Sequence, residues 1–450
     1  MLLAINVKTA THVKSFSNIF SVSNKKNILY LEGYYSVLDG GEGYFKWNQT
    51  INKSKADGGI IIDPTVSFGN QGKGRGYGCW IRQYTGNIKT EWFGIKGDGS
   101  DMSMAFNHLI KYIRFKGGGT VLLPAKTISV SNLDFTACNN ITIIGQGKLS
   151  VIDFKYAQKG IGLNFGSKRG IGGTQNIILS NFTLTNSRYK MNTLLEFRSG
   201  PTRQKPVETS GFITLKNLFL QKGAEKGLSL VGVSHVLAEG IVLRFNTPID
   251  YGLYISQDVN INTGVFTFRN CSFRAKKTAL RIEASKQLID SILFEGCGFF
   301  NYLNPLAREV IVLNGQRYAI ESVKFLACHI ESRNTHFNKK TAIALKGKLH
   351  SINFDTIHLS CGKSNIKTQA DYAIKFHNRG NYKNILFNNM SILRCKKASK
   401  GGVVYYFEGQ DSSFDKESPI QFRGLIKSVT EPKKFKLDNK HYQKYFINEV

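Results

Sequence analysis

Two acidic residues, Glu239 and Glu295, occupy the same position of an apolar pattern that recurs along the chain, and Arg269 occupies that position between them. Paired carboxylates can act as a general acid and a general base. If successive copies of the pattern stack in register, the two acids lie two strands apart, ~9.6 Å at the usual strand spacing. A Glu-Arg-Glu column can equally be a run of salt bridges that serves stability alone. The residues themselves leave both interpretations open.

A second pair of acids ends a short strand in adjacent repeats, at Asp258 and Glu283. Their placement makes them another candidate acid and base. Residues at strand ends also accept backbone hydrogen bonds in turns, so a purely structural role is the alternative. The candidate catalytic residues are Glu239, Glu295, Asp258 and Glu283.

Aromatic and basic side chains accompany these acids at outward positions. Rings on strands more often pack than bind a ligand, yet an exposed tyrosine offers a flat face and a polar tip. An arginine can pair with anionic groups. The candidate substrate-binding residues are Arg269, Tyr251, Tyr254 and Tyr302.

The sequence indicates neither a metal ion nor a cofactor. His329 and His358 share an outward position in adjacent repeats, but no column of carboxylates accompanies them, so surface histidines are expected. The seven cysteines lack tight CxxC spacing, and no cluster of Asp residues suggests calcium. Three cysteines share one inward position and are expected to stack as small core hydrophobes: Cys271, Cys297 and Cys328.

All these positions belong to one apolar pattern, h-x-h-x-x-h-x-h, in which h is apolar and x is any residue. Its copies begin at intervals of 23 to 36 residues, a period typical of solenoids. Apolar and polar residues alternate except at one two-residue step, as expected for a strand that bends while one face stays inward. The copies are Ile177–Leu184, Ile213–Leu220, Val236–Leu243, Phe266–Phe273, Ile292–Phe299, Val323–Ile330, Ile352–Leu359 and Ile385–Ile392.

A second short strand follows each copy after a loop of variable length. These runs are too short, and too rich in Val, Ile, Phe and Tyr, to be amphipathic helices. We therefore predict an all-β fold, a single-stranded parallel β-helix whose outward residues form columns along its axis. The second strands are Leu194–Phe197, Leu228–Val231, Leu253–Ile255, Ala279–Ile282, Val310–Leu313, Ala342–Leu345, Ala373–Phe376 and Val403–Phe407.

The composition is globular, with 41% hydrophobic residues in a chain of 450. A formal net charge of +30 favours an anionic partner, although lysines on an elongated surface are the plainer explanation. The first residues lack the basic start and apolar run of a signal peptide, and no stretch is long enough for a membrane span. We expect synthesis and folding in a reducing cytoplasm.

The chain divides into four parts. Residues 1–90 combine short strands with glycine turns and predict a small separate β module. Residues 91–140 hold an amphipathic helix, which begins near Asp101 and stops at Gly117, and the first strands; the helix is expected to cover the open end of the coil. Residues 141–410 form the parallel β-helix. Residues 411–450 are basic and polar, and are expected to form a C-terminal cap or a tether.

Several segments within residues 29–147 resemble the start of phage tailspikes with a pectate-lyase-like β-helix. The chain departs from that pattern in two places, with Met102-Ser103 at the start of the helix and Lys126 where a glycine is usual, and neither position is catalytic in the family. The upstream segments resemble the module that precedes the β-helix in many tailspikes. The matching segments are Gly40–Trp47, Asp57–Gly59, Gly78–Gln83, Trp92–Gly99, Gly117–Ala125 and Ile141–Gly147.

This resemblance implies a right-handed parallel β-helix in a homotrimer that is part of a virion tail. The N-terminal module would dock to other tail proteins, and the coil would bind a bacterial surface polysaccharide, either capsule or lipopolysaccharide. Tailspike hydrolases generally use paired carboxylates, and the expected Glu239–Glu295 separation is near the upper end of the ~6.5–9.5 Å typical of inverting enzymes.

Three functions fit these features. A tailspike could bind the anionic glycan and depolymerise it, with glycoside hydrolysis favoured over lyase chemistry. A non-catalytic adhesive or structural tail protein could bind the same glycan through its positive charge. A cellular polysaccharide lyase or hydrolase is a further alternative, which the upstream module disfavours.

Overall fold

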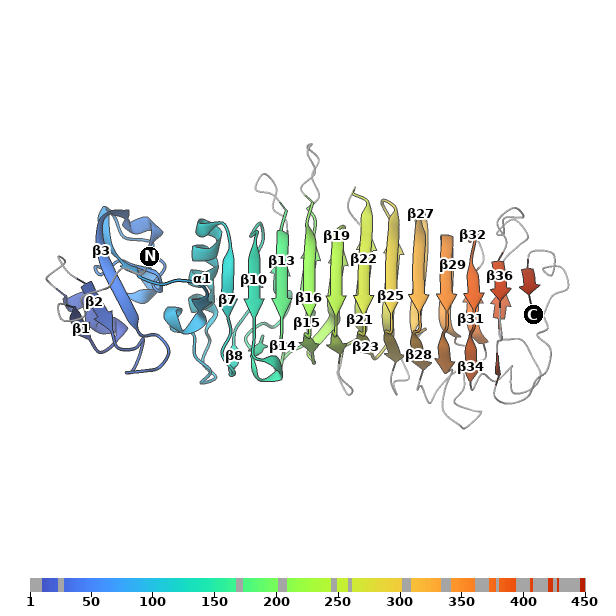
Figure 1. Ribbon diagram of the computed structural model, residues 1–450, viewed down its shortest axis with the longest axis horizontal. Coiled ribbons are helices and arrows are strands. Elements are labelled where there is room, and N and C mark those ends of the chain that lie inside the picture. The colour runs from blue at the N-terminus through green and yellow to red at the C-terminus, as the bar shows by residue number, and fades with distance from the viewer. Residues whose placement is uncertain are drawn as a thin grey trace.

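The protein is an elongated coil of short strands with a separate module at its N-terminal end (Figure 1). From the N-terminus onward, the module comes first, one α-helix comes next, and the stacked turns of the coil follow. The computed structural model describes residues 10–22, 28–166, 173–200, 209–243, 249–257, 261–301, 309–332, 341–360, 372–377, 380–393, 405–407, 420–423, 427–428 and 446–449.

The N-terminal module is built on a five-stranded sheet with strand order β1-β2-β3-β5-β4. One core cluster of the module includes Phe16, Leu29, Phe45 and Trp80, while Ile61 and Cys79 belong to the core of the coil. The strands are β1 (Thr11–Val13), β2 (Ile28–Leu31), β3 (Gly43–Asn52), β4 (Ile61–Ile62) and β5 (Tyr77–Arg82).

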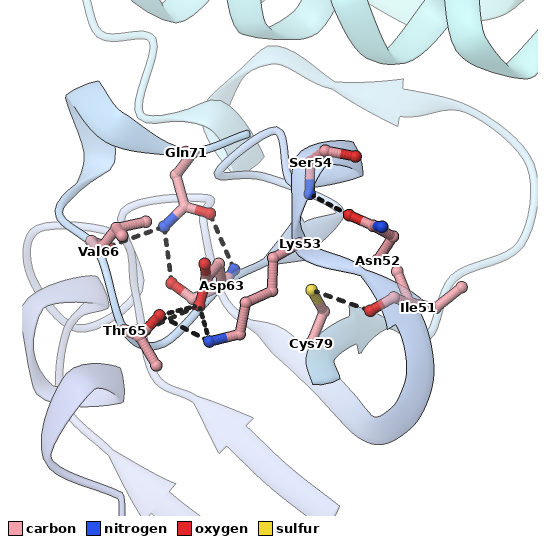
Figure 2. A network of polar contacts seen from close by, with 9 residues as sticks. All are labelled: Ile51, Asn52, Lys53, Ser54, Asp63, Thr65, Val66, Gln71 and Cys79. Atoms are coloured by element: carbon pink, nitrogen blue, oxygen red, sulfur yellow. Dashed lines mark hydrogen bonds and ion pairs between the residues drawn. The ribbon is translucent and has the colours of Figure 1, made fainter. Parts of the chain in front are cut away.

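A buried polar network holds the glycine-rich loop of this module in place (Figure 2). The Asp63 side chain is fully buried and pairs with Lys53 Nζ at 3.3 Å, while Thr65 Oγ1 donates to its Oδ1 atom at 2.6 Å. A Cβ atom at Gly74 would lie 2.0 Å from Asp63 Oδ2, so only glycine fits there. The loop around Gly74 therefore packs against a buried carboxylate.

Helix α1 (Ser103–Lys116) lies between the module and the first turn of the coil (Figure 1). Its buried side chains, among them Phe106, Leu109 and Ile113, belong to the same core as the coil. Asp101 Oδ1 accepts from the amide of Ser103 at 2.9 Å. Gly117, with φ at 80°, ends the helix as the sequence predicted.

The coil has three faces, and we number them in the order in which the chain visits them on each turn. Face 1 begins with β6 (Ile88–Lys89) and β7 (Gly119–Leu122). It continues through β10 (Ile141–Ile144), β13 (Gln175–Ser180), β16 (Gly211–Lys216), β19 (Ser234–Glu239), β22 (Thr263–Arg269), β25 (Ile289–Glu295), the second halves of β27 (Ile311–Leu326) and β29 (Thr341–Asp355), β32 (Asn381–Lys383), β33 (Leu386–Asn388), β36 (Ile420–Arg423) and β38 (Phe446–Glu449).

Face 2 is the narrowest sheet, and face 3 completes each turn. Face 2 holds β8 (Thr127–Ser129), β11 (Val151–Asp153), β14 (Thr183–Thr185), β17 (Phe219–Leu220), β20 (Val242–Leu243), β23 (Ser272–Ala275), β26 (Gly298–Asn301), β28 (His329–Ser332), β30 (His358–Ser360), β34 (Ser391–Leu393) and β37 (Lys427–Ser428). Face 3 holds β9 (Leu133–Asp134), β12 (Ile161–Phe165), β15 (Met191–Arg198), β18 (Ala224–Val231), β21 (Tyr251–Gln257), β24 (Thr278–Ala284), the first halves of β27 and β29, β31 (Tyr372–Phe376) and β35 (Tyr405–Phe407).

The predicted apolar pattern corresponds to a face 1 strand, a sharp turn and a face 2 strand. The two-residue step is the turn itself, where one residue adopts a positive φ, as Asn181 and Asn217 do. Asparagine tolerates this conformation well, and Asn217 Nδ2 donates to Asn181 Oδ1 at 3.1 Å on the turn below. The predicted parallel β-helix with a capping helix and a preceding β module is confirmed.

Stacks of identical side chains fill the coil. Phe268, Phe294, Phe325, Phe354 and Phe387 stack face to face, with ring centroids 4.7 to 5.2 Å apart. The three cysteines expected to share a column are aligned as well, because the residues after them pair as Ser272, Gly298 and His329. All three thiols are buried, and burial raises the pKa of Cys328 to about 12.

The described strands continue past residue 410. β36 pairs with β33, β38 pairs with β36, and β37 pairs with β34, all in parallel. These short segments add turns to faces 1 and 2 within the range expected to form a cap or a tether. Among the residues that the structure describes, no helix has the length and apolar character needed to cross a bilayer.

Candidate functional site

The face 1 column that contains Glu239 and Glu295 is in register, as the sequence predicted. In the strand register, Glu239 lies beside Arg269 on the next turn, and Arg269 lies beside Glu295 on the turn after that. Arg269 Nε lies 2.9 Å from Glu295 Oε2, and both side chains are well exposed, at 53% and 41%. Arg269 thus neutralises one acid of the predicted pair, as in a salt-bridge column. A catalytic role for Glu239 and Glu295 stays a prediction.

Glu283 lies on face 3 in a polar cluster. It accepts hydrogen bonds from the Tyr254 hydroxyl, from Arg281 and, at 3.4 Å, from Asn314 Nδ2. Burial opposes its charge, but the hydrogen bonds from Arg281 and Tyr254 outweigh this effect and lower the pKa of Glu283 below its ordinary value. Glu283 is therefore a carboxylate at neutral pH, and its lowered pKa makes it a poor proton donor and a weak base.

Tyr251 and Tyr254, two of the predicted substrate-binding residues, lie together on face 3 with ring centroids 6.2 Å apart. Lys226 Nζ lies 4.2 Å from the Tyr254 ring centroid, and the Lys277 and Arg281 cations each lie 5.9 Å from that of Tyr251. The cluster combines rings with cations, of which Lys277 pairs with Asp250 and Arg281 with Glu283.

The other predicted site residues are not part of this cluster. Arg269 lies on face 1, away from the tyrosines. Asp258 and Tyr302 lie outside the described residues, so their predicted roles are neither supported nor opposed.

A different pair of acids, Asp290 and Glu321, lies at the edge where face 3 turns into face 1. Ile289 pairs with Ile320, which places Asp290 opposite Glu321 on the next turn of the coil. We name the residues at this position the edge column; in order they are Gly211, Ser234, Gly264, Asp290, Glu321, His350 and Lys383. In the part of the chain that the structure describes, neither acid forms an ion pair with a lysine or arginine.

Asp290 packs over Gly264 on the preceding turn. A Cβ atom at Gly264 would lie 2.0 Å from Asp290 Oδ1, so the glycine makes room for the carboxyl group. Burial, and after it the negative charge of Glu321, raise the pKa of Asp290 above its ordinary value. Asp290 therefore holds its proton to higher pH than an ordinary aspartic acid does.

Glu321 is held from the other side. His350 Nδ1 donates to Glu321 Oε1 at 2.8 Å, because a carboxylate can only accept. Asp290 leans toward Gly264 and Glu321 toward His350, so the two carboxyl groups lean apart. An acid with a raised pKa beside an oriented carboxylate is the arrangement that acid–base catalysis needs.

A row of exposed side chains runs beside the edge column, one residue further along each face 1 strand. Phe212 is 54% exposed, and its ring stacks on that of His235 at 4.7 Å. Val265 follows on the next turn, and all three residues have positive φ. Such a conformation is strained for valine. The row provides an apolar platform that leads to Asp290.

The sequence contained a signal for the edge column that the pattern-based prediction passed over. Each of its members lies two residues before the first apolar position of a repeat; Asp290 precedes Ile292 in this way and Glu321 precedes Val323. The prediction followed only positions inside the pattern. Counting two residues outward from the first apolar position of each repeat would have found both acids.

No group of three or more His, Cys, Asp or Glu side chains that could hold a metal ion occurs among the described residues.

The N-terminal module matches a known family. Residues 12–85 match the model of the phage tail protein small four-stranded beta-sheet domain. This match covers the module and not the coil. A comparison with curated proteins finds no match.

The whole chain is similar in fold to solved phage tailspikes. The enzymatically active domain of tailspike protein 2 from bacteriophage CBA120 has a TM-score of 0.60 at 12% identity, with 94% of this chain and 59% of that chain covered. The tailspike of Acinetobacter phage vB_ApiP_P1 has a TM-score of 0.51 at 13% identity, with coverage of 97% and 75%. The gp42 tailspike of Acinetobacter phage vb_AbaP_AS12 has a TM-score of 0.51 at 15% identity, with coverage of 94% and 72%.

These identities establish a shared fold and nothing finer. This chain spans 59% of the length of the CBA120 domain, less than two thirds of it. The predicted fold is confirmed: a module that matches a phage tail domain precedes a parallel β-helix with the fold of solved tailspikes.

Proposed function

We propose that this protein is a phage tail component that binds an anionic polysaccharide of the bacterial surface and hydrolyses it at Asp290 and Glu321. The observation that carries the proposal is the pair of acids on successive turns, one with a raised pKa and one held by His350. The tailspike fold and the net charge of +30 support the choice of substrate.

In the proposed reaction Asp290 is the acid. Its carboxyl group gives a proton to the glycosidic oxygen as the bond between that oxygen and the anomeric carbon breaks. Glu321 takes a proton from a water molecule, whose oxygen forms the new bond to the anomeric carbon. His350 keeps the Glu321 carboxylate directed at this water. Because the water attacks the anomeric carbon directly, the reaction inverts the configuration at that carbon.

Binding of the polymer falls to the surfaces on either side of the pair. Phe212 and His235 would stack against sugar rings upstream on face 1. On face 3, Tyr251 and Tyr254 would stack against sugar rings, and Lys226 would contact the acidic groups of the glycan. Both surfaces are exposed or half-buried on the outside of the coil.

The remaining parts of the chain would serve the virion. Residues 1–90 would dock to other tail proteins, an assignment that the match of residues 12–85 supports. The coil would assemble as a homotrimer, with its location in the virion tail. Size-exclusion chromatography with light scattering measures that assembly directly, and a monomeric mass at working concentration contradicts it.

The test is incubation of the protein with purified capsule and with lipopolysaccharide of the host. Hydrolysis releases oligosaccharides with new reducing ends, in proportion to time and enzyme. Products that carry an unsaturated uronate would show β-elimination instead and would remove Asp290 from the acid role.

An adhesive tail protein without catalysis is the second candidate, and the neutralised face 1 column favours it. That column and the net charge of +30 could serve stability and electrostatic adhesion alone. Binding to the glycan that weakens with added salt, with no oligosaccharide released, supports this candidate against hydrolysis.

A further inference from the structure

A pocket opens on face 1 just beyond the edge column, in the direction of the C-terminus. Its volume is about 340 Å³, within the usual range for small-ligand sites. None of the residues that line it is charged, in a chain with a net charge of +30. They are Ser351, Asn353, Asn384, Ile385, Leu386 and Gln421.

The pocket adjoins the proposed catalytic pair. Ser351 follows His350 in the sequence, and His350 pairs with Glu321. Asn353 lies on the same turn as Ser351, and it pairs with Leu386 on the next. A ligand in the pocket therefore lies one to two turns of the coil, ~5–10 Å, from Glu321.

Asn353 has a polar atom that its surroundings do not satisfy. Its Oδ1 atom is buried, and no hydrogen-bond donor in the described residues reaches it. An unsatisfied buried acceptor costs roughly 1–3 kcal/mol of stability. A ligand that brings an N–H group into the pocket would remove this cost.

Polar and apolar groups are arranged together in the pocket. Ser351, Asn384 and Gln421 offer hydroxyl and amide groups, and the half-buried Leu386 offers an apolar surface. Ser351 and Asn384 have positive φ, at 55° and 51°, like the other residues of the exposed row beside the edge column. This combination suits a ligand with hydroxyl groups, one amide N–H and one methyl group.

We propose that this pocket binds an N-acetylamino sugar of the polysaccharide, with the acetamide N–H donating to Asn353 Oδ1 and the methyl group against Leu386. The sugar is a unit of the polymer cut at Asp290 and Glu321, so the inference rests on the proposed function for the source of its ligand. The pocket holds the unit that lies on the C-terminal side of the cleavage point. The glycan then runs along the coil axis.

Saturation-transfer NMR with the full-length Asp290→Asn chain tests the pocket without turnover. The probes are chitotetraose and cellotetraose, which share a β-1,4 backbone and differ in the acetamido group. We expect saturation of the acetyl methyl protons of chitotetraose and little transfer to cellotetraose. Equal transfer to both probes overturns the acetamide assignment.

Asn353→Leu removes the unsatisfied oxygen while it keeps the side-chain size. We expect chitotetraose binding to fall by about 10-fold, the loss of roughly one hydrogen bond, while the melting temperature stays the same or rises. Thr214→Val is the matched control, because Thr214 occupies the same column several turns away and outside the pocket. Unchanged binding by Asn353→Leu contradicts the proposal.

The same variants separate this inference from the proposed function. If the protein binds chitotetraose through Asn353 but releases no oligosaccharide from host glycan, the proposed pocket is supported and the proposed hydrolysis is contradicted. If the Asn353→Leu variant cleaves the host glycan as well as the unsubstituted protein does, the proposed hydrolysis is supported and the proposed pocket is contradicted.

Discussion

Two columns of charged side chains run along the coil, only a few residues apart on the same strands, and they differ in how their acids are balanced. In the face 1 column, Arg269 stands between Glu239 and Glu295 and pairs with Glu295 at 2.9 Å. In the edge column, Asp290 and Glu321 are neighbours with no cation between them. The stacking of the coil is the same for both. Among the described residues no lysine or arginine forms an ion pair with the edge acids, and burial together with the charge of Glu321 raises the pKa of Asp290.

This difference shows how a repetitive scaffold can hold structural and chemical sites side by side. Stacking at ~4.8 Å brings any two acids at one position of adjacent turns within mutual influence. An arginine on the intervening turn converts the column into surface ion pairs. A glycine on the preceding turn, such as Gly264, instead lets an acid settle into a partly buried place.

The largest expected effect is on activity, from Asp290→Asn. The variant cannot donate a proton, so depolymerisation should fall by about 10²–10⁴-fold, the usual contribution of a general acid. Reducing-end release from the host glycan measures it. Asp355→Asn is the matched control on the face 1 column, and it should change the rate by less than about twofold. Equal losses from the two variants would erase the distinction between the columns.

Gly264→Ala should displace the Asp290 carboxyl group while the aspartic acid itself is kept. The added Cβ would lie 2.0 Å from Asp290 Oδ1 and 2.5 Å from the Asp290 backbone oxygen, so both the carboxyl group and the strand must shift. We expect a loss of about 10–100-fold in rate, as small misplacements in active sites cause. Gly211→Ala, in the same column but opposite Ser234, is the control. A change in the alkaline limb of the pH profile, absent in the control, marks an effect through Asp290.

The pH dependence of activity also distinguishes the edge column from the face 1 column. Asp290 must be protonated to act, and its pKa is raised by burial and by Glu321. Activity is therefore retained above the ordinary pKa of an aspartic acid and is lost as the pH rises through the raised value. Carboxyl ¹³C NMR of the full chain should show the pKa of Asp290 falling toward its ordinary value in Glu321→Gln. An unchanged titration of Asp290 in that variant rules out the coupling.

The smallest effect is expected from Arg269→Ala. The Arg269–Glu295 pair is exposed to solvent, so its loss should lower the free energy of unfolding by no more than ~1 kcal/mol. The difference in melting temperature between Arg269→Ala and the unsubstituted protein should shrink as salt is added, because salt screens such a pair. Depolymerisation should be unaffected. A large loss of activity in Arg269→Ala would instead support Glu239 and Glu295 as the catalytic pair.

Much of the fold could be predicted because it repeats. The alignment of Cys271, Cys297 and Cys328 and the register from Glu239 through Arg269 to Glu295 follow from one apolar pattern, and both are confirmed. The two-residue step marked the turn at Asn181 and Asn217. Periodicity determines which residues share a column, because each turn adds the same inward side chains.

The site was harder to predict, because it depends on contacts and not on period. Nothing in the pattern tells that Glu283 accepts from Tyr254 and Arg281, which come from neighbouring turns. The raised pKa of Asp290 depends on how deeply its carboxyl group settles over Gly264. The edge column lies two residues before the first apolar position of each repeat, outside the pattern that the prediction followed.

The most direct test of the edge column is one assay with Glu321→Gln and Glu295→Gln side by side. The chemical change is identical, and the two residues lie on consecutive turns of the coil. We predict that Glu321→Gln loses at least about 10²-fold in the initial rate of reducing-end release from the host glycan, while Glu295→Gln retains it. A fully active Glu321→Gln beside an inactive Glu295→Gln would contradict the account and place the chemistry on the face 1 column.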